Sequence, residues 1–263
     1  MNRLKAAGAL TEAPFFAARR GKGGFDVQFC SAFGVMLRDM AILKFLPAIS
    51  VVVGVLFSAV MTAPIGVASS SDGVLSPGTT VSMWGSTSHV VCTAGFLARN
   101  RRGTEVLLEA GHCDHGGELT MTAGRAGGQV PVGGFVVSEP GGDNTDAADI
   151  GVVRLEKNVP VQPSIAGTIP VRGSLSYLAP GQTLCKVGAV TGRSCGPVIE
   201  SSASKVRFSA AVAPGDSGGP VYAMRSDGSA VAVGITISHA LDDGDVIAEL
   251  IDPWLQRWDL TVD

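Results

Sequence analysis

Glycine divides the sequence into short β-prone runs, and this spacing limits the possible folds more than any other feature. The chain has 35 glycines in 263 residues. Gly-Gly pairs at 116–117, 127–128, 133–134 and 141–142 separate runs rich in Val, Ile, Leu and Thr. Short runs at near-regular intervals with turn residues between them indicate an all-β sandwich or a pair of barrels. The expected strands are 89–97, 104–108, 118–122, 128–137, 150–155, 183–187, 197–202, 205–211, 220–224 and 230–238.

The first 68 residues differ in charge from the rest of the chain. They contain seven basic and three acidic residues, whereas the remainder contains thirteen basic and twenty acidic ones. An uncharged apolar run at 45–63 follows Lys44, and small residues precede a cleavage position after Ala68. This pattern is typical of a secretory signal peptide, and the run is also long enough for an uncleaved membrane anchor. Either leader places the body outside the cytoplasm. Met36 or Met40 would give the leader a start of more ordinary length.

A connector rich in Pro and Gly, at 157–178, divides the body into halves of similar size. One helix is expected at 246–260, where apolar residues recur at spacings of three and four positions. Pro253 kinks this helix or marks a second start. The expected segments are a leader at 1–68, an extended segment at 69–88, a first β half at 89–156, the connector at 157–178 and a second β half at 179–263.

The cysteine count fits an exported chain. Loss of the leader removes Cys30 and leaves four cysteines, and an even number in an exported chain indicates two disulfides. Four cysteines allow three pairings. The local pairs Cys92–Cys113 and Cys185–Cys195 are favoured, and each would stabilise the fold by about 3 kcal/mol on the loop-entropy model.

Ser217 lies in the segment Pro-Gly-Asp-Ser-Gly-Gly-Pro at 214–220 and is the candidate nucleophile. A serine hydroxyl is a weak nucleophile that needs a base and a place for developing negative charge. The glycines let the backbone turn sharply, so that the N–H groups of Gly215 and Ser217 can converge on one oxyanion. The alternative is a glycine-rich hairpin that carries an incidental serine.

His112 lies in Leu-Glu-Ala-Gly-His-Cys at 108–113, beside a cysteine and just after an apolar strand. A histidine held at a strand end next to a disulfide suits a general base. The alternative is a metal site, because Asp114 and His115 follow. Cys113 is better used in a disulfide, however, and two histidines alone make a poor zinc ligand set.

Asp149 opens the apolar strand expected at 150–155, so its carboxylate should lie at a strand end against the core. A buried carboxylate needs a hydrogen-bond partner, and an imidazole N–H supplies one and is oriented in return. On its own, an aspartate before a strand is usually a turn or cap residue. The motifs around His112 and Ser217 favour the catalytic role, with Asp146 as the reserve candidate.

Together these motifs resemble the chymotrypsin-like serine peptidase family, whose triad follows the same order of His, Asp and Ser. The segment at 185–198, Cys-Lys-Val-Gly-Ala-Val-Thr-Gly-Arg-Ser-Cys-Gly-Pro-Val, is similar to the disulfide hairpin of the bacterial streptogrisin and α-lytic branch. The resemblance covers residues 88–240 and rests mainly on the Gly-Asp-Ser-Gly-Gly-Pro and Ala-Gly-His-Cys motifs.

The resemblance implies an all-β fold of two antiparallel six-stranded barrels with a short C-terminal helix. The triad of His112, Asp149 and Ser217 would lie in the cleft between the barrels. Bacterial members carry an internal basic residue after the first hairpin cysteine, where this chain has Lys186. We therefore expect an ion pair between Lys186 and Asp216 that shapes the oxyanion loop without proteolytic activation.

The sequence departs from the family pattern in four places. Glu109 stands where the family usually has Thr or Ser, and a buried carboxyl group there needs a partner or carries a raised pKa. The third disulfide of relatives and their long pro-region have no counterpart. Residues 234–240 replace the Ser-containing segment that supports the catalytic aspartate, and Thr236 or Ser238 is expected to take this role.

The specificity pocket is expected just before Ser217, at 208–213, with Ala211 in its wall. No acidic residue occurs there, which argues against cleavage after Lys or Arg. Small apolar walls favour an apolar side chain before the scissile bond. Ser238 and His239 are further pocket candidates, and His239 offers the alternative of an acidic side chain.

We therefore expect a secreted or cell-surface serine endopeptidase, monomeric, that acts on polypeptides without a metal or cofactor. The negatively charged body indicates no nucleic-acid partner. We expect contact with a membrane only if the leader stays uncleaved and anchors the chain. A catalytically inactive homologue acting as an extracellular binding module is the main alternative, motivated by Glu109 and the altered pocket segment. An α/β-hydrolase esterase is disfavoured, because that fold orders its triad Ser, acid, His.

Overall fold

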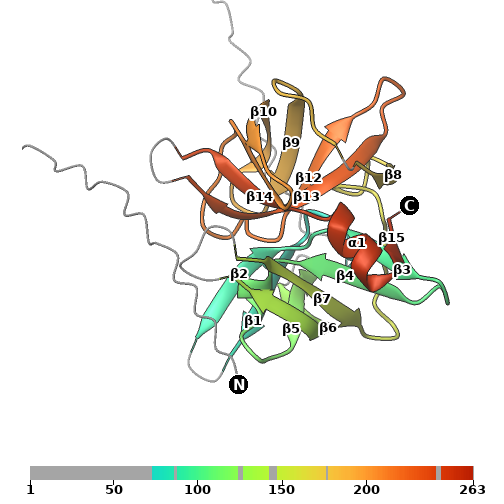
Figure 1. Ribbon diagram of the computed structural model, residues 1–263. Coiled ribbons are helices and arrows are strands. Elements are labelled where there is room, and N and C mark those ends of the chain that lie inside the picture. The colour runs from blue at the N-terminus through green and yellow to red at the C-terminus, as the bar shows by residue number, and fades with distance from the viewer. Residues whose placement is uncertain are drawn as a thin grey trace, which may run out of the picture. The chain divides into compact units, whose positions relative to one another are not determined.

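The computed structural model describes residues 73–85, 88–123, 127–141, 147–175, 177–240 and 244–262 (Figure 1). The leader expected at 1–68, with Cys30, and the reserve candidate Asp146 lie outside these residues. Strands dominate the described chain, as the glycine-punctuated runs predicted. Its helices are one short α-helix, α1 (Asp252–Trp258), and a 3-10 turn (Gly111–Cys113). Within this part of the chain, no helix has the length and apolar character to cross a membrane.

The first sheet has eight antiparallel strands, in the order β15-β3-β4-β7-β6-β5-β1-β2. Most of it comes from the first half of the body, and the last strand of the chain is added at one edge. The strands are β1 (Thr80–Trp84), β2 (His89–Thr93), β3 (Leu97–Asn100), β4 (Glu105–Glu109), β5 (Leu119–Ala123), β6 (Gly128–Pro140), β7 (Asp149–Leu155) and β15 (Leu260–Thr261).

The second sheet has seven strands, in the order β12-β9-β10-β11-β14-β13-β8. An additional pairing between β12 and β13 closes six of them into a barrel, while β8 lies outside the ring and runs parallel to β13. The strands are β8 (Val171–Ser174), β9 (Thr183–Gly188), β10 (Gly192–Ser201), β11 (Lys205–Phe208), β12 (Pro220–Met224), β13 (Ala230–His239) and β14 (Val246–Leu250).

The structure corrects the expectation of two six-stranded barrels, because only the second sheet closes. The first sheet stays open, with β2 and β15 as its two edge strands. At the end of β2, the N–H of Thr93 donates to the carbonyl oxygen of Ser217 (2.7 Å), which belongs to the second half of the chain. The outer edge of β3 is paired with β15. The backbone groups at the end of β2 and at the outer edge of β3, which could close the first barrel by pairing with each other, are instead bonded to later parts of the chain.

The expectation of one helix over 246–260 is also corrected. Its first part is the strand β14, which pairs with β11 on one side and β13 on the other. The helix α1 begins only after Ile251, with Pro253 in its first turn. Of the two roles expected for Pro253, it therefore marks a helix start and not a kink. Two further strands lie outside the expected strand runs: β1 is in the segment expected to be extended at 69–88, and β8 is in the connector at 157–178.

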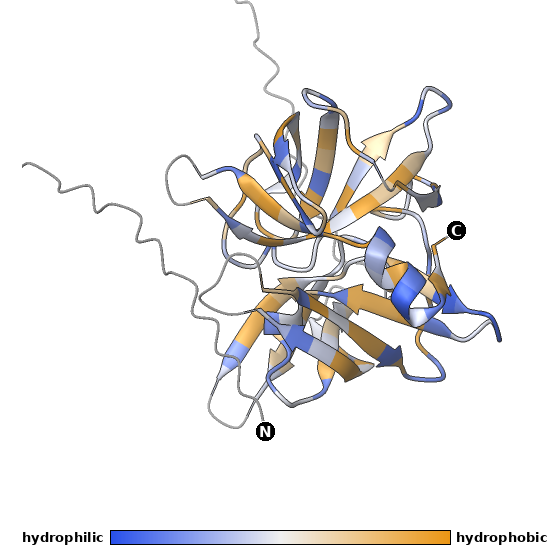
Figure 2. Ribbon diagram, in the orientation of Figure 1, coloured by the Kyte–Doolittle hydropathy of each residue, from blue (hydrophilic) through white to orange (hydrophobic). Residues whose placement is uncertain are grey.

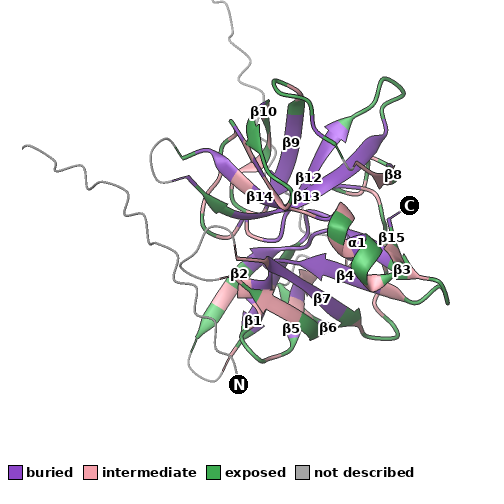
Figure 3. Ribbon diagram, viewed as in Figure 1, coloured by how far each residue is buried: buried purple, intermediate pink, exposed green. Residues whose placement is uncertain are grey.

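Two apolar clusters form the core. One lies mainly under the first sheet and includes Leu107, Leu108 and Ile150, together with Tyr222 and Ile235 from the second half. The other fills the closed barrel. Figure 2 shows apolar and polar residues alternating along the strands, and Figure 3 shows β13 largely buried while α1 is mainly exposed or half-buried. Side chains shared across the two sheets therefore hold together the region that carries the candidate site.

Candidate active site

Ser217 lies in the tight loop between β11 and β12, and two glycines shape this loop. Gly215 and Gly218 have φ angles of +101° and +84°, a left-handed conformation that favours glycine. Gly218 also has no room for a side chain, because a Cβ there would lie 2.4 Å from the carbonyl oxygen of Thr93. The backbone that carries Ser217 therefore depends on this glycine pattern.

The two expected oxyanion donors have no competing partner within the described residues. The backbone N–H groups of Gly215 and Ser217 donate to no protein group there, whereas those of Asp216 and Gly218 donate to backbone carbonyls. The Thr93 hydroxyl donates to the carbonyl oxygen of Gly215 (2.7 Å) and anchors the loop to the end of β2. Both N–H groups thus remain available as hydrogen-bond donors.

Asp216 and Lys186 form an ion pair in which both side chains are fully buried (Nζ to Oδ2, 2.5 Å). The Thr191 hydroxyl donates to the same carboxylate (2.6 Å), as do the backbone N–H groups of Val190 (2.9 Å) and Ala213 (3.0 Å). The carboxylate next to Ser217 is therefore surrounded by donors from β9, the β9–β10 turn and its own loop.

The pKa shifts of this pair follow from its surroundings. Burial alone would raise the pKa of Asp216, but hydrogen bonds from Lys186 and Thr191 outweigh it and hold the pKa below its ordinary value. Burial lowers the pKa of Lys186, and the charge and hydrogen bond of Asp216 oppose that change. The Asp216 carboxylate therefore stays ionised and keeps the loop anchored.

His112 and Asp149 meet through two hydrogen bonds. His112 Nδ1 lies 2.8 Å from Asp149 Oδ2, and the backbone N–H of His112 donates to Oδ1 (3.0 Å). Asp149 is the first residue of β7, and His112 is in the 3-10 turn that follows β4, the neighbour of β7. The aspartate side chain is 12% exposed and the imidazole is 34% exposed, so the ring is held from one side and accessible from the other.

The serine loop is connected to the histidine turn through β2. The Thr93 N–H bond to the Ser217 carbonyl oxygen joins the serine loop to the strand that Cys92 links to Cys113, the residue after His112. Within the described residues, no hydrogen bond joins the imidazole of His112 to the Ser217 hydroxyl. Such contacts are often long in ligand-free enzymes and tighten when substrate binds.

Two disulfides brace the site. Cys92–Cys113 (S–S 2.00 Å) ties β2 to the turn of the histidine, and Cys185–Cys195 (S–S 2.03 Å) joins opposed residues of β9 and β10. Both are the local pairings that the sequence favoured. The first bond positions the turn that carries His112, and the second stiffens the hairpin that carries Lys186.

Glu109 is fully buried, three residues before His112. Its Oε1 accepts a hydrogen bond from the N–H of Ala110 (3.2 Å), and its Oε2 has no partner in the described chain. Burial raises the pKa of Glu109 well above its ordinary value, and the charge of Asp149 raises it further against weaker opposition from the N–H groups of Ala110 and Gly95. The pKa of Glu109 is therefore raised, the second of the two outcomes expected from the sequence.

Within the described residues, no hydrogen bond joins Asp149 to the residues expected to support it, Thr236 and Ser238. Ser238 is exposed at the end of β13. Thr236 is buried, but its Oγ1 has no partner within the described residues, and its backbone bonds to Gly218 and Gly219 of the serine loop. Besides its pairing with β6, the backbone N–H of Asp149 donates to Glu249, a residue that the sequence motifs did not suggest.

The candidate pocket residues lie at the surface. Ala211 is exposed, and its N–H donates to Ser194 Oγ (2.8 Å). His239 is exposed next to Ser238. The strand expected at 205–211 ends at Phe208, which leaves Ala211 in the loop that leads to Ser217. The side chains at these three positions are therefore exposed to a ligand.

The alternative of a metal site around His112 receives no support from the described contacts. His112 Nδ1 faces Asp149, and His115 Nδ1 bonds to the hydroxyl of Ser88 (2.8 Å). The donor atoms of Cys92, Glu109 and Cys113 lie within 4.8 Å of one another. The two sulfurs are bonded to each other, however, and offer no thiolate to a metal.

One curated relative shares part of this chain's sequence. No family model matches the chain. An uncharacterised protein, found in two strains of Mycobacterium tuberculosis, is 30% identical over 156 residues, which is 55% of this chain and 66% of the relative. The match thus spans just under two thirds of that relative.

Solved structures give a broader match. A Nocardiopsis protease is 25% identical with a TM-score of 0.55, covering 71% of this chain and 98% of its own. A homologue of alpha-lytic protease is 26% identical with a TM-score of 0.54, covering 72% and 100%. A glutamic-acid-specific serine protease is 23% identical with a TM-score of 0.56, again covering 72% and 100%. The structural neighbours of this chain are bacterial chymotrypsin-like serine proteases, and its fold is chymotrypsin-like.

Proposed function

We propose that the protein is a serine endopeptidase in which Ser217 is the nucleophile, His112 the general base and Asp149 the residue that orients the base. The observation that carries this proposal is the double hydrogen bond between His112 and Asp149, at 2.8 and 3.0 Å. It fixes the imidazole through both the ring and the backbone and leaves the other side of the ring accessible. A general base needs this combination.

In this mechanism His112 takes the proton of Ser217 as the serine oxygen attacks the peptide carbonyl. Asp149 accepts the hydrogen bond from Nδ1–H, which selects the tautomer that leaves Nε2 free and stabilises the imidazolium. The leaving amine receives the proton from His112. Water then attacks the acyl-enzyme with the same residue as base, and Ser217 is restored.

The developing negative charge would be stabilised by the N–H groups of Gly215 and Ser217. Each such donor contributes about 3 kcal/mol in related enzymes. The buried pair of Lys186 and Asp216 holds the loop that presents these donors, since Asp216 lies between them in the chain. The loop is thus assembled by contacts within the described chain.

The substrates implied by this fold are polypeptides. The two disulfides fit an extracytoplasmic location. We propose an apolar side chain before the scissile bond, since residues 208–213, which contain Ala211, include no acidic residue. His239 supports an acidic side chain as the second candidate, and one structural neighbour is a glutamic-acid-specific protease that uses histidines in substrate binding. Cleavage of a peptide library followed by mass spectrometry distinguishes the two.

The test of the proposed function is hydrolysis of a peptide substrate by the full chain and by Ser217→Ala. We expect kcat of the variant to fall by at least about 10⁴-fold, with folding unchanged. Ser226→Ala, at an exposed turn position, is the matched control and should keep full activity. A folded wild-type protein with both disulfides intact and no hydrolysis of any peptide in a diverse library would instead indicate the inactive homologue.

A further inference from the structure

Lys205 and Glu249 form a buried ion pair in the second half of the chain. They are directly opposed on the neighbouring strands β11 and β14, and Lys205 Nζ lies 2.6 Å from Glu249 Oε2. The Glu249 side chain is 0% exposed and that of Lys205 is 12% exposed. Two charges withdrawn from water in this way require further hydrogen bonds if the pair is to be stable.

Two of those further bonds go to the start of β7, in the other sheet. Lys205 Nζ donates to the carbonyl oxygen of Ala147 (2.7 Å), and the N–H of Asp149 donates to Glu249 Oε2 (3.3 Å). The pair therefore holds the backbone on both sides of Ala148. The other carboxylate oxygen, Glu249 Oε1, accepts from Trp254 Nε1 of α1 (2.9 Å), which fixes the carboxylate in turn.

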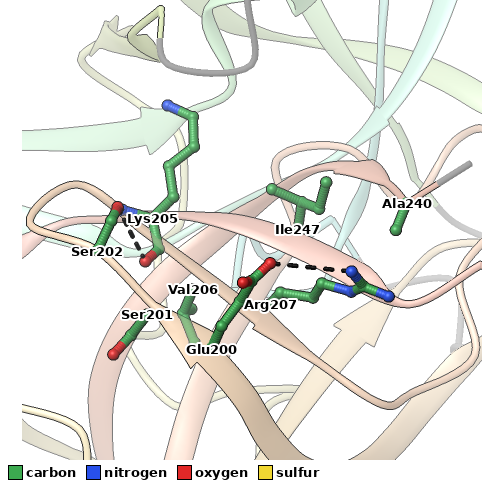
Figure 4. Close-up of a pocket in the computed structure, with 8 residues that line it drawn as sticks. All are labelled: Glu200, Ser201, Ser202, Lys205, Val206, Arg207, Ala240 and Ile247. Atoms are coloured by element: carbon green, nitrogen blue, oxygen red, sulfur yellow. Dashed lines mark hydrogen bonds and ion pairs between the residues drawn. The ribbon is translucent and has the colours of Figure 1, made fainter. Parts of the chain in front are cut away.

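Lys205 is one of the residues that line a surface pocket, but its Nζ is bonded to Glu249 and to the carbonyl oxygen of Ala147. That pocket has a volume of about 350 Å³ and lies over β10, β11 and β14. Glu200 and Arg207, which form an ion pair, also line the pocket. In Figure 4 the Lys205 side chain points away from both of them. The ammonium group thus serves the segment that leads into Asp149.

We propose that the Lys205–Glu249 pair is a positioning device for Asp149, and that it supplies from β11 and β14 the support that Thr236 and Ser238 do not give. This inference rests on the proposed function. The carboxylate of Asp149 can hold His112 only if its own backbone is fixed, and the pair fixes that backbone from the opposite sheet. Loss of the pair should misplace the imidazole during proton transfer while leaving substrate binding intact.

The test compares Glu249→Gln with wild type in the full chain, measuring kcat and KM on a peptide substrate per folded molecule. We expect kcat to fall by about 10- to 100-fold with KM within about twofold, because a small misplacement of a catalytic group costs that much. The downfield proton resonance of His112 Nδ1–H, which reports the bond to Asp149, should weaken or move. Glu200→Gln, on the exposed ion pair of the neighbouring strand, is the control and should change none of these readouts.

The double variant Lys205→Met/Glu249→Leu distinguishes a positioning role from a purely structural one, because it leaves no buried charge and keeps the strands packed. We expect this variant to fold and to show the same reduced kcat as Glu249→Gln. A folded double variant, or a folded Glu249→Gln variant, with wild-type kcat and an unchanged His112 resonance would overturn the inference. If the wild-type enzyme itself cleaves no peptide, the proposed function has failed, which is a different result.

Discussion

Glu109 is a buried acid between the serine loop and the aspartate of the candidate triad. Its Oε1 lies 1.4 Å from the position that a Cβ on Gly218 would take, and the charge of Asp149 contributes to its raised pKa. A neutral Glu109 is compatible with catalysis, because it adds no second negative charge near the imidazolium that Asp149 stabilises. A charged Glu109 would disturb both the loop and the triad.

We predict that Glu109→Gln becomes increasingly stable relative to wild type as the pH rises. Because the folded-state pKa of Glu109 is raised, its stabilising contribution is complete below the unfolded value near 4.5 and is lost as the pH rises toward the folded value. Glutamine does not ionise, so the difference should grow by up to about 1.4 kcal/mol per pH unit in that window.

Urea unfolding of both proteins from about pH 4 to 8 measures this difference. Glu105→Gln, in the same strand and paired with Arg99 near the surface, is the matched control. A stability difference between Glu109→Gln and wild type that stays constant with pH would show that Glu109 has no raised pKa.

Gly218 and Gly228 offer a direct test of how tightly the serine loop is packed. Both have left-handed backbones, at φ +84° and +83°, but a Cβ at Gly228 would meet no atom within 4 Å. Gly218→Ala should therefore be less stable than Gly228→Ala by about 1–3 kcal/mol, the usual cost of overpacking. It should also lose about 100-fold in kcat/KM. Equal effects of the two substitutions on stability and activity would contradict the packing described for the loop.

At the scale of elements, the β9–β10 hairpin is the support of the serine loop, through Lys186. Lys186→Met leaves the buried Asp216 without its charge partner, and we expect a loss of about 3–5 kcal/mol in the free energy of unfolding. Peptide hydrolysis should fall with it, because the loop loses its anchor. Lys157→Met, at an exposed turn, is the control. Unchanged stability and activity in Lys186→Met would refute this role of the hairpin.

The elements also show what local sequence patterns can predict. Runs of β-prone residues between glycines located the main strands, because those runs are short and bounded by turns. The apolar spacing at 246–250 predicts a helix, yet this segment is β14, since β11 and β13 pair with it on both sides. Pairing with distant strands outweighed the local helical pattern, and only the part after Ile251 became helix.

At the scale of the whole molecule, the motifs predicted the serine and histidine segments, the two disulfides and the Lys186–Asp216 pair, but not how the first sheet closes or what supports Asp149. Strand closure and the support of Asp149 depend on residues far apart in the chain. Glu249 is 100 residues from Asp149 and belongs to the other sheet. No spacing rule connects such positions in a single sequence. The same holds for β15, which joins the first sheet from the opposite end of the chain.

The central claim, that Ser217 is an activated nucleophile, is tested most directly by labelling the full chain with a fluorophosphonate. Such a reagent reacts with a serine only when a base and an oxyanion site activate it. We predict one label per molecule, located on Ser217 by peptide mass spectrometry and absent from both Ser217→Ala and His112→Ala. A folded, disulfide-intact protein that takes up no label, or that is labelled equally in Ser217→Ala, would contradict the account.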